Sequence, residues 1–142
     1  MPFLYQEDFV NLKLTNCPPS GYKPKIIETA FRWVYDDIDD SRNFVSQYHK
    51  NPKRFLDKNE KTICSGLALS MFDSIGNAQA RFYELREILQ QKAYNTLGTK
   101  IAVGTITESD GVNSETDENG HFNHHLTTNT NYNKRFKIIE SL

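Results

Sequence analysis

The chain has 142 residues, enough for one ordinary domain with a real hydrophobic core. Lysine and arginine together number 17 and aspartate and glutamate 18, so the net charge of -1 gives no general attraction to nucleic acid or anionic lipid. No window is long and apolar enough for a membrane span, and the start MPFLYQEDFVNLKL lacks a secretory signal pattern. Neither nucleic acid nor a membrane is therefore expected among the partners.

Two cysteines, Cys17 and Cys64, lie far apart in the sequence and form no CxxC pair. This spacing argues against both a zinc knuckle and a disulfide scaffold. We therefore expect a reducing, cytoplasmic location, with Cys64 acting as a small buried apolar residue.

Residues 1–24 are expected to form an N-terminal arm. Pro18 and Pro19 remove two backbone donors there and bias the preceding residue toward extended geometry, which disfavours a helix. The next stretch, AFRWVY at 30–35, alternates aromatic residues with others and predicts a strand. Its aromatic side chains share one face, and Arg32 lies on the other.

Charged residues dominate the stretch that follows. Four aspartates open DDIDDSRNFVSQYHKNP at 36–52, where they would complement the positive end of a helix dipole. We expect a helix that Pro52 ends. The segment KRFLDKNEK at 53–61 is expected to be a surface loop.

The middle of the chain gives the clearest periodicities. TICSGLALSMF at 62–72 predicts a buried strand, with Leu69 among its large side chains and Ser70 on the side of small ones. DSIGNAQARFYELREILQQKAY at 73–94 has apolar residues at helical spacing and polar residues able to cap its start. The predicted core is represented by four residues: Trp33, Leu69, Phe82 and Leu85.

Two more strands are predicted, TKIAVGTIT at 99–107 and KRFKII at 134–139. Residues 107–133 between them are rich in Asn, Thr, Asp, Ser and Gly, and are expected to be a long polar loop, which in a compact domain is usually functional or disordered. The expected fold is α+β, a single compact domain of residues 1–142 with a mixed or antiparallel sheet packed by one or two helices.

Three of the four histidines fall within GHFNHH at 120–125. In an extended segment His121, Asn123 and His125 would share one face; in a helical turn His121 would face His124 and His125. Structural polar groups, a substrate or partner contact with proton transfer, and a metal site all remain open. A zinc site would need further ligands from Asp110, Asp117, Glu118 or His49.

Adjacent residues rarely supply three ligand vectors to one ion. We therefore expect no metal and no cofactor, and a polar contact surface made by His121, Asn123, His124 and His125.

Strong catalytic motifs are missing from the sequence. It contains no P-loop, GxGxxG, HExxH or kinase signature, and Ser70 lacks the GxSxG setting of a hydrolase nucleophile. Arg32 could project its guanidinium into a pocket that takes a phosphate or carboxylate, although a stacked or ion-paired arginine is the commoner case.

Several short segments resemble a family of small uncharacterised bacterial proteins that has no established activity. They are CPP at 17–19, FRWV at 31–34, GLALSMF at 66–72 with Ala78 after it, IAVGTI at 101–106 and the histidine cluster.

The order of three polar residues is also similar to that in ADP-ribosyltransferase-like folds. There an Arg or His on an early strand, a Ser-bearing strand leading into a helix, and a late acidic or polar residue line a nicotinamide dinucleotide cleft. Arg32, Ser70 and one of His121, His124 or Glu118 follow this order. The late catalytic glutamate of such transferases has no assigned counterpart.

The leading hypothesis is a small cytoplasmic bacterial protein that acts as a binding or accessory module. It would bind a protein or small-molecule ligand through residues 107–133, and a conflict or defence system is one context in which such a module would act. The alternative is an ADP-ribosyltransferase-like enzyme that uses a phosphate-bearing cosubstrate in a cleft near Arg32 and the histidine cluster. Its candidate catalytic residues are Arg32, Ser70, His121 and His124. Convergence of Arg32 and Ser70 with His121 or His124 on one cavity would favour the enzyme.

Overall fold

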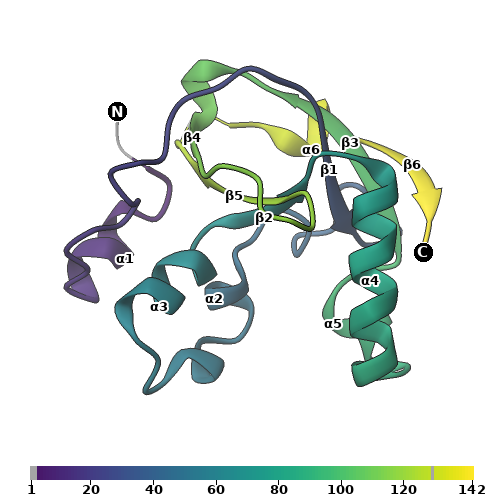
Figure 1. Ribbon diagram of the computed structural model, residues 1–142, viewed down its shortest axis with the longest axis horizontal. Coiled ribbons are helices and arrows are strands. Elements are labelled where there is room, and N and C mark those ends of the chain that lie inside the picture. The colour runs from purple at the N-terminus through teal and green to yellow at the C-terminus, as the bar shows by residue number, and fades with distance from the viewer. Residues whose placement is uncertain (1–2, 129) are drawn as a thin grey trace.

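The computed structural model describes residues 3–128 and 130–142. Within them the chain forms one six-stranded sheet in the order β4-β5-β2-β1-β3-β6, with every pairing antiparallel (Figure 1). The strands are β1 (Ile27–Val34), β2 (Leu69–Phe72), β3 (Lys100–Ile106), β4 (Gly111–Asn113), β5 (His121–Leu126) and β6 (Lys137–Ser141). The expected α+β fold is confirmed.

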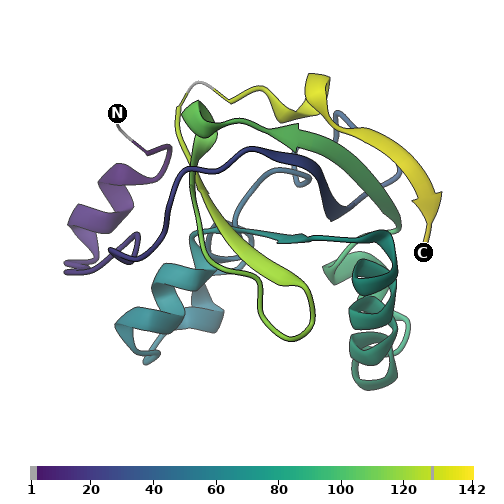
Figure 2. The ribbon, with the colours of Figure 1, turned by 45° about the horizontal axis from the view of Figure 1, so that its top comes forward.

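Six helices accompany the sheet in the described part of the chain. They are α1 (Gln6–Asn11), α2 (Gln47–Lys50), α3 (Glu60–Gly66), α4 (Ile75–Leu89), α5 (Lys92–Thr96) and α6 (Tyr132–Arg135), with short 3₁₀ helices at Pro52–Phe55 and Glu108–Asp110. Both views place α4 and α5 together below one end of the sheet and α2 and α3 below the other (Figures 1 and 2). Among the described residues, no helix is both long and apolar enough to cross a membrane.

The segment predicted to be one helix, 73–94, is helical but is divided at Gln90, whose φ is 56°, into α4 and α5. The Ser74 side chain caps the start of α4 by accepting a hydrogen bond from the Asn77 backbone N–H at 3.1 Å. Ala78 and Phe82, one turn apart, are buried against the sheet, and the Trp33 indole of β1 donates to the Ala78 carbonyl at 2.9 Å. This contact fixes α4 beside the centre of the sheet.

The core is only partly as predicted. Leu69 and Phe82 are fully buried, whereas Trp33 and Leu85 are half-buried because both line a cavity between β1 and α4.

The prediction of a helix over 36–51 is wrong, except that α2 forms at the end of this stretch. The aspartates instead bond to nearby backbone: Asp37 accepts from the Asp39 N–H and Asp40 from the Arg42 N–H, both at 2.9 Å. Such local side-chain bonds compete with the helix and favour turns.

Four further segments differ from the sequence prediction. One is the strand expected over 134–139, which begins only at Lys137 because Tyr132–Arg135 form α6. The N-terminal arm contains α1, and the loop expected over 53–61 contains a 3₁₀ helix with buried Phe55. The strand expected over 62–72 begins only at Leu69 because Asn59 caps α3, accepting from the Thr62 N–H at 2.9 Å.

Residues 107–133 are not a long polar loop. They contain the hairpin of β4 and β5, in which β5 pairs with β2 along its length, including Ser70 opposite Asn123 and Phe72 opposite His121. The loop was predicted from the polar composition of the segment alone. The prediction failed because strand pairing and side-chain hydrogen bonds satisfy the backbone and side-chain polar groups of these residues. The turn of the hairpin contacts the start of α4, where the Asp73 N–H donates to the Gly120 carbonyl at 2.9 Å.

Cys17 and Cys64 form a disulfide that joins the N-terminal arm to α3. The prediction against a disulfide scaffold is therefore wrong, because the arm folds back onto α3 across 47 residues of sequence. Disulfides persist mainly in oxidising compartments, so the cysteine spacing no longer supports the predicted cytoplasmic location.

Candidate functional site: a basic cavity under the sheet

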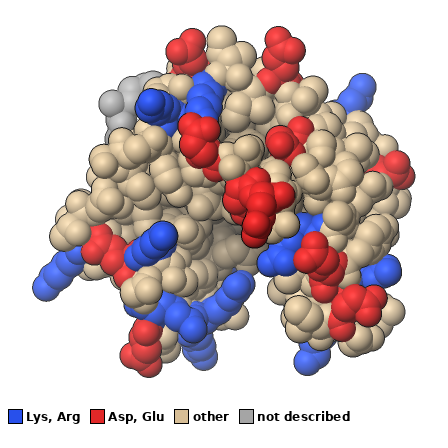
Figure 3. Space-filling view, viewed as in Figure 1, with Lys and Arg blue, Asp and Glu red and all other residues tan. Residues whose placement is uncertain are grey.

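A cavity of about 260 Å³ lies between the two helix groups, under β1 and β2. Figure 3 shows this face hollowed between the groups, with Lys and Arg side chains on both sides of the hollow. A second cavity, of about 330 Å³, shares Gln47, Lys50 and Arg54 with the first. The two cavities therefore adjoin along α2 and the 3₁₀ helix after it.

Arg32 of β1 lies at the inner wall of the first cavity with only 5% of its surface exposed. Its Nε donates to the Asn43 carbonyl at 2.8 Å and its Nη1 to the Ser70 carbonyl at 2.7 Å. Its Nη2 also donates to the Val45 carbonyl at 3.5 Å. The three carbonyls hold its orientation and leave two of the five N–H groups of the guanidinium for a ligand. Burial lowers the pKa of Arg32 to about 10. Because this value is still well above 7, the guanidinium is charged at neutral pH.

Three more basic side chains line the same cavity: Lys50 of α2, Arg54 of the 3₁₀ helix that follows, and Arg81 of α4. Burial, followed by repulsion from Arg32 and Arg42, lowers the pKa of Lys50 to about 8. One carboxylate, that of Asp117, also lines the cavity. The surplus of positive charge favours an anionic ligand, above all a phosphate that arginine can bind with two parallel hydrogen bonds.

Ser70, His121 and Asp117 form a chain of polar groups that lines the same cavity. The Ser70 hydroxyl is hydrogen-bonded to His121 Nε2, and His121 Nδ1 lies 3.6 Å from an Asp117 carboxylate oxygen. The other Asp117 oxygen accepts from the backbone N–H groups of Asn119 at 2.8 Å and His121 at 3.0 Å. The tight turn between β4 and β5 thus fixes the carboxylate beside the imidazole.

This arrangement suits proton transfer. Burial lowers the pKa of His121, so its ring is neutral at pH 7. With the proton of the neutral ring on Nδ1, beside Asp117, Nε2 can accept the proton of a hydroxyl group. Enzymes commonly activate a hydroxyl group with a base that a third group holds in position. Here Ser70 supplies the hydroxyl, His121 the base and Asp117 the third group.

The structure brings together three of the four candidate catalytic residues, because Arg32, Ser70 and His121 line one cavity. His124 lies elsewhere, with 0% exposure. Its Nδ1 is 2.7 Å from the Asn113 amide oxygen and its Nε2 2.6 Å from the Tyr132 hydroxyl. Burial lowers the pKa of His124 to about 3, and its neutral ring is part of the core.

Burial along β5 divides the histidine cluster, and His125 is buried although it shares a face of the strand with His121 and Asn123. His121 and Asn123 remain partly exposed, while His125 is 1% exposed and has its Nε2 3.7 Å from Cys64 Sγ. The expected contact surface of four residues therefore lacks two accessible rings, those of His124 and His125. A binding role stays a prediction for His121 and Asn123.

Of the residues expected as additional zinc ligands, Asp117 lies beside His121, while two others are engaged elsewhere. Asp110 pairs with Arg135, and His49 lies beside Asp8, with 3.0 Å between its Nε2 and a carboxylate oxygen. Glu118 is exposed in the turn between β4 and β5.

The sequence alone did not indicate Lys50, Arg54 or Arg81 as site residues, and it offered Asp117 only as a metal ligand. These residues come from α2, the 3₁₀ helix after it, α4 and the turn between β4 and β5, and no local spacing indicates that their side chains meet.

Comparison with family models, curated proteins and solved structures found no match to this chain. The resemblance to small bacterial proteins stays a prediction.

Proposed function

We propose that the basic cavity binds a phosphate-bearing cosubstrate of the nicotinamide dinucleotide type and that the protein transfers a group from it. One observation carries this proposal: Arg32, Ser70 and His121, far apart in sequence, line the same cavity as three further basic side chains. Perturbed titratable groups in a cleft are typical of functional sites.

The basic side chains supply the binding part of the proposal. Arg32 is preoriented by backbone carbonyls and suits a bidentate contact with a phosphate, and Lys50 adds a point charge. The half-buried Trp33 offers an aromatic surface for a base or pyridine ring. A cavity of about 260 Å³ holds only part of a dinucleotide, and the adjoining cavity of about 330 Å³ gives room for the rest.

Ser70, His121 and Asp117 supply the chemical part. The glycosidic C–N bond to nicotinamide breaks, and its electron pair leaves with nicotinamide. The oxygen of an acceptor hydroxyl bonds to the freed ribose carbon, and His121 Nε2 takes the hydroxyl proton. Ser70 orients the acceptor or serves as the acceptor itself. The carboxylate of Asp117 stabilises the positive charge that develops on the imidazole.

The other hypothesis, a partner-binding module built on residues 107–133, keeps less support. Its predicted surface includes two buried histidines, and the exposed residues of the segment fall in separate stretches, among them 107–109 and 115–119. The cytoplasmic, bacterial setting remains part of the proposal, and in a reducing cytoplasm the Cys17–Cys64 bond would be open.

The test is incubation of the purified protein with NAD⁺ and measurement of released nicotinamide, together with transfer of a labelled ADP-ribosyl group to added protein. We expect release by the wild type and a loss of about 10²-fold or more in His121→Gln, as for removal of a general base. Lys92→Gln, an exposed change on α5 outside the cavity, is the matched control. No release by the folded wild type, or equal rates in His121→Gln and wild type, contradicts the proposal.

A further inference from the structure

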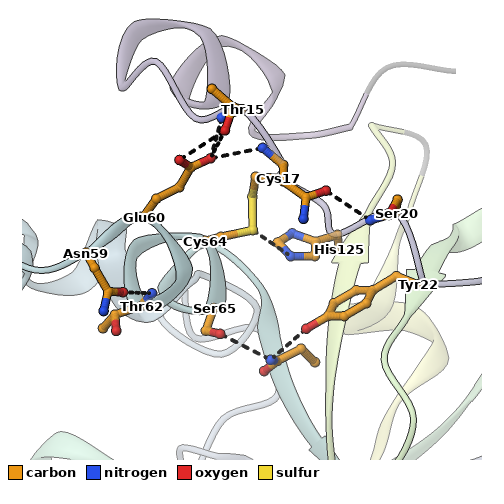
Figure 4. The surroundings of a disulfide bond; sticks show 12 residues. Thr15, Cys17, Ser20, Tyr22, Asn59, Glu60, Thr62, Cys64, Ser65 and His125 are labelled. Carbon is orange, nitrogen blue, oxygen red and sulfur yellow. Dashed lines mark hydrogen bonds between the residues drawn. A yellow bond between two sulfur atoms is a disulfide. The ribbon is translucent and has the colours of Figure 1, made fainter.

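A second group of chemically reactive side chains lies away from the basic cavity, around the disulfide (Figure 4). Cys17 comes from the arm after α1, Cys64 from α3 and His125 from β5. One ligand atom from each, two Sγ and one imidazole nitrogen, lie within 4.8 Å of one another. Three segments distant in sequence thus bring a Cys₂His set to one point.

We propose that reduction of the disulfide turns Cys17, Cys64 and His125 into a binding site for one zinc ion. A dithiol reductant supplies two electrons and two protons, is itself oxidised to a disulfide, and leaves two thiols on the protein. Zn²⁺ then binds both sulfurs as thiolates and releases their two protons to solvent. The oxidised and the zinc-bound states exclude each other because they use the same sulfur atoms.

The spacing of one sulfur and one nitrogen already fits one edge of such a site. With Zn–S near 2.3 Å and Zn–N near 2.05 Å, a tetrahedral ion places sulfur and nitrogen ligands about 3.6 Å apart. The distance from His125 Nε2 to Cys64 Sγ is 3.7 Å. The same geometry places the two sulfurs about 3.8 Å apart, which requires the covalent bond to open.

Contacts near Cys17 keep its segment close to α3 when that bond opens. The backbone N–H groups of Thr15 and Asn16 and the hydroxyl of Thr15 all donate to the Glu60 carboxylate at the start of α3 (Figure 4). These hydrogen bonds lower the pKa of Glu60, so the carboxylate that anchors the arm stays charged. The two cysteines are therefore held within reach of one ion without the disulfide.

His125 has the features of a ligand more than those of a core residue. Its ring is 1% exposed, packs against the edge of Phe9, and lies 5.8 Å from the Tyr22 ring. Its Nδ1 is buried with no hydrogen-bond partner among the described residues. Packing alone would be served better by phenylalanine, since a buried unpaired nitrogen is unfavourable. The proximity of Nε2 to the sulfurs explains an imidazole at this position, because Nε2 can bind the same ion.

A fourth ligand of the ion would find room beside Cys64. A cavity of about 410 Å³ adjoins Cys64 and is lined also by Tyr22, Glu60 and Ser65. Three protein ligands with an accessible fourth position match zinc sites that keep a water or bind a small ligand. Thiolate and imidazole together favour zinc over the hard ions magnesium and calcium.

Cobalt(II) and zinc binding to the intact chain test the proposal. The protein is reduced with a phosphine, desalted without oxygen, and titrated with Co²⁺, whose tetrahedral thiolate complexes absorb visible light; zinc affinity follows from displacement of cobalt. Four samples are compared: oxidised wild type, reduced wild type, reduced His125→Phe, and reduced His49→Gln as the histidine control outside this site.

We expect one ion per chain in the reduced wild type and in His49→Gln, and none in the oxidised wild type. His125→Phe should bind at least about 100-fold more weakly, since even loss of an outer contact costs 10- to 100-fold. Should His125→Phe fail to fold, nitrogen NMR of the reduced wild type replaces it, and zinc must shift Nε2 of His125 alone among the histidines. No stoichiometric binding by the reduced wild type, unchanged affinity in folded His125→Phe, or an unshifted His125 overturns the proposal.

Discussion

Acid should destabilise this fold through His124 well before its carboxylates are protonated. His124 is fully buried between Asn113 and Tyr132, and burial lowers its pKa from 6.5 to about 3. Between these values the unfolded chain binds a proton at this residue and the folded chain does not. The stability is therefore complete above pH 6.5 and falls as pH decreases toward 3.

The expected size follows from the linkage relation. One such group changes the free energy of unfolding by about 1.4 kcal/mol per pH unit, so at pH 5 the loss relative to pH 7 is about 2 kcal/mol. His121 and His125, whose pKa values burial also lowers, act in the same direction and add to this value.

Urea unfolding of the oxidised protein at pH 7 and pH 5 measures this loss, and NMR titration of the His124 ring assigns it. We expect a lower midpoint at pH 5 and a His124 signal that does not titrate between pH 7 and pH 5. Equal free energies of unfolding at the two pH values, or titration of His124 near pH 6.5 in the folded state, would refute the reasoning.

Three further predictions follow from burial, chain connectivity and charge. Leu69→Ala should lower the free energy of unfolding by about 2 to 5 kcal/mol, because Leu69 is fully buried at the centre of the sheet, and an unchanged urea midpoint would contradict this. Cys17→Ser with Cys64→Ser should cost up to about 4 kcal/mol in metal-free buffer, from the entropy of a 47-residue loop, and calorimetry that finds equal melting temperatures would refute that estimate. Affinity for a dinucleotide phosphate should fall as pH rises through about 8, where Lys50 loses its charge, and Lys50→Met should remove this dependence in a binding titration.

Local signals in the sequence predicted the elements that depend on local interactions. Helix α4 has helical apolar spacing and a capping Ser74, and β1 has strict alternation around Arg32 and Trp33. Both form within the expected parts of the chain, although the predicted helix is divided at Gln90 and β1 already begins at Ile27. The run of aspartates misled because Asp37 and Asp40 bond their own turns, which the dipole argument did not consider.

Nonlocal contacts explain the main errors. His124 can be buried in β5 only because Asn113 and Tyr132 satisfy both ring nitrogens, and composition alone does not show such partners. The disulfide depends on the arm reaching α3, which the spacing of Cys17 and Cys64 does not reveal.

The candidate site was accessible to sequence reasoning only in outline. The order of Arg32, Ser70 and His121 suggested a shared cleft, and these residues line one cavity. The basic residues of α2 and α4 join it through tertiary packing of two helix groups, which no motif encodes.

Calorimetric titration of NAD⁺ into the protein tests the central claim, that the basic cavity binds a phosphate-bearing cosubstrate. The wild type and the exposed control Lys92→Gln should bind one equivalent with the same affinity, and Arg81→Gln should bind at least about tenfold more weakly because a charge-assisted contact to phosphate is lost. No binding heat with the folded wild type, or equal affinities in Arg81→Gln and wild type, would contradict the account.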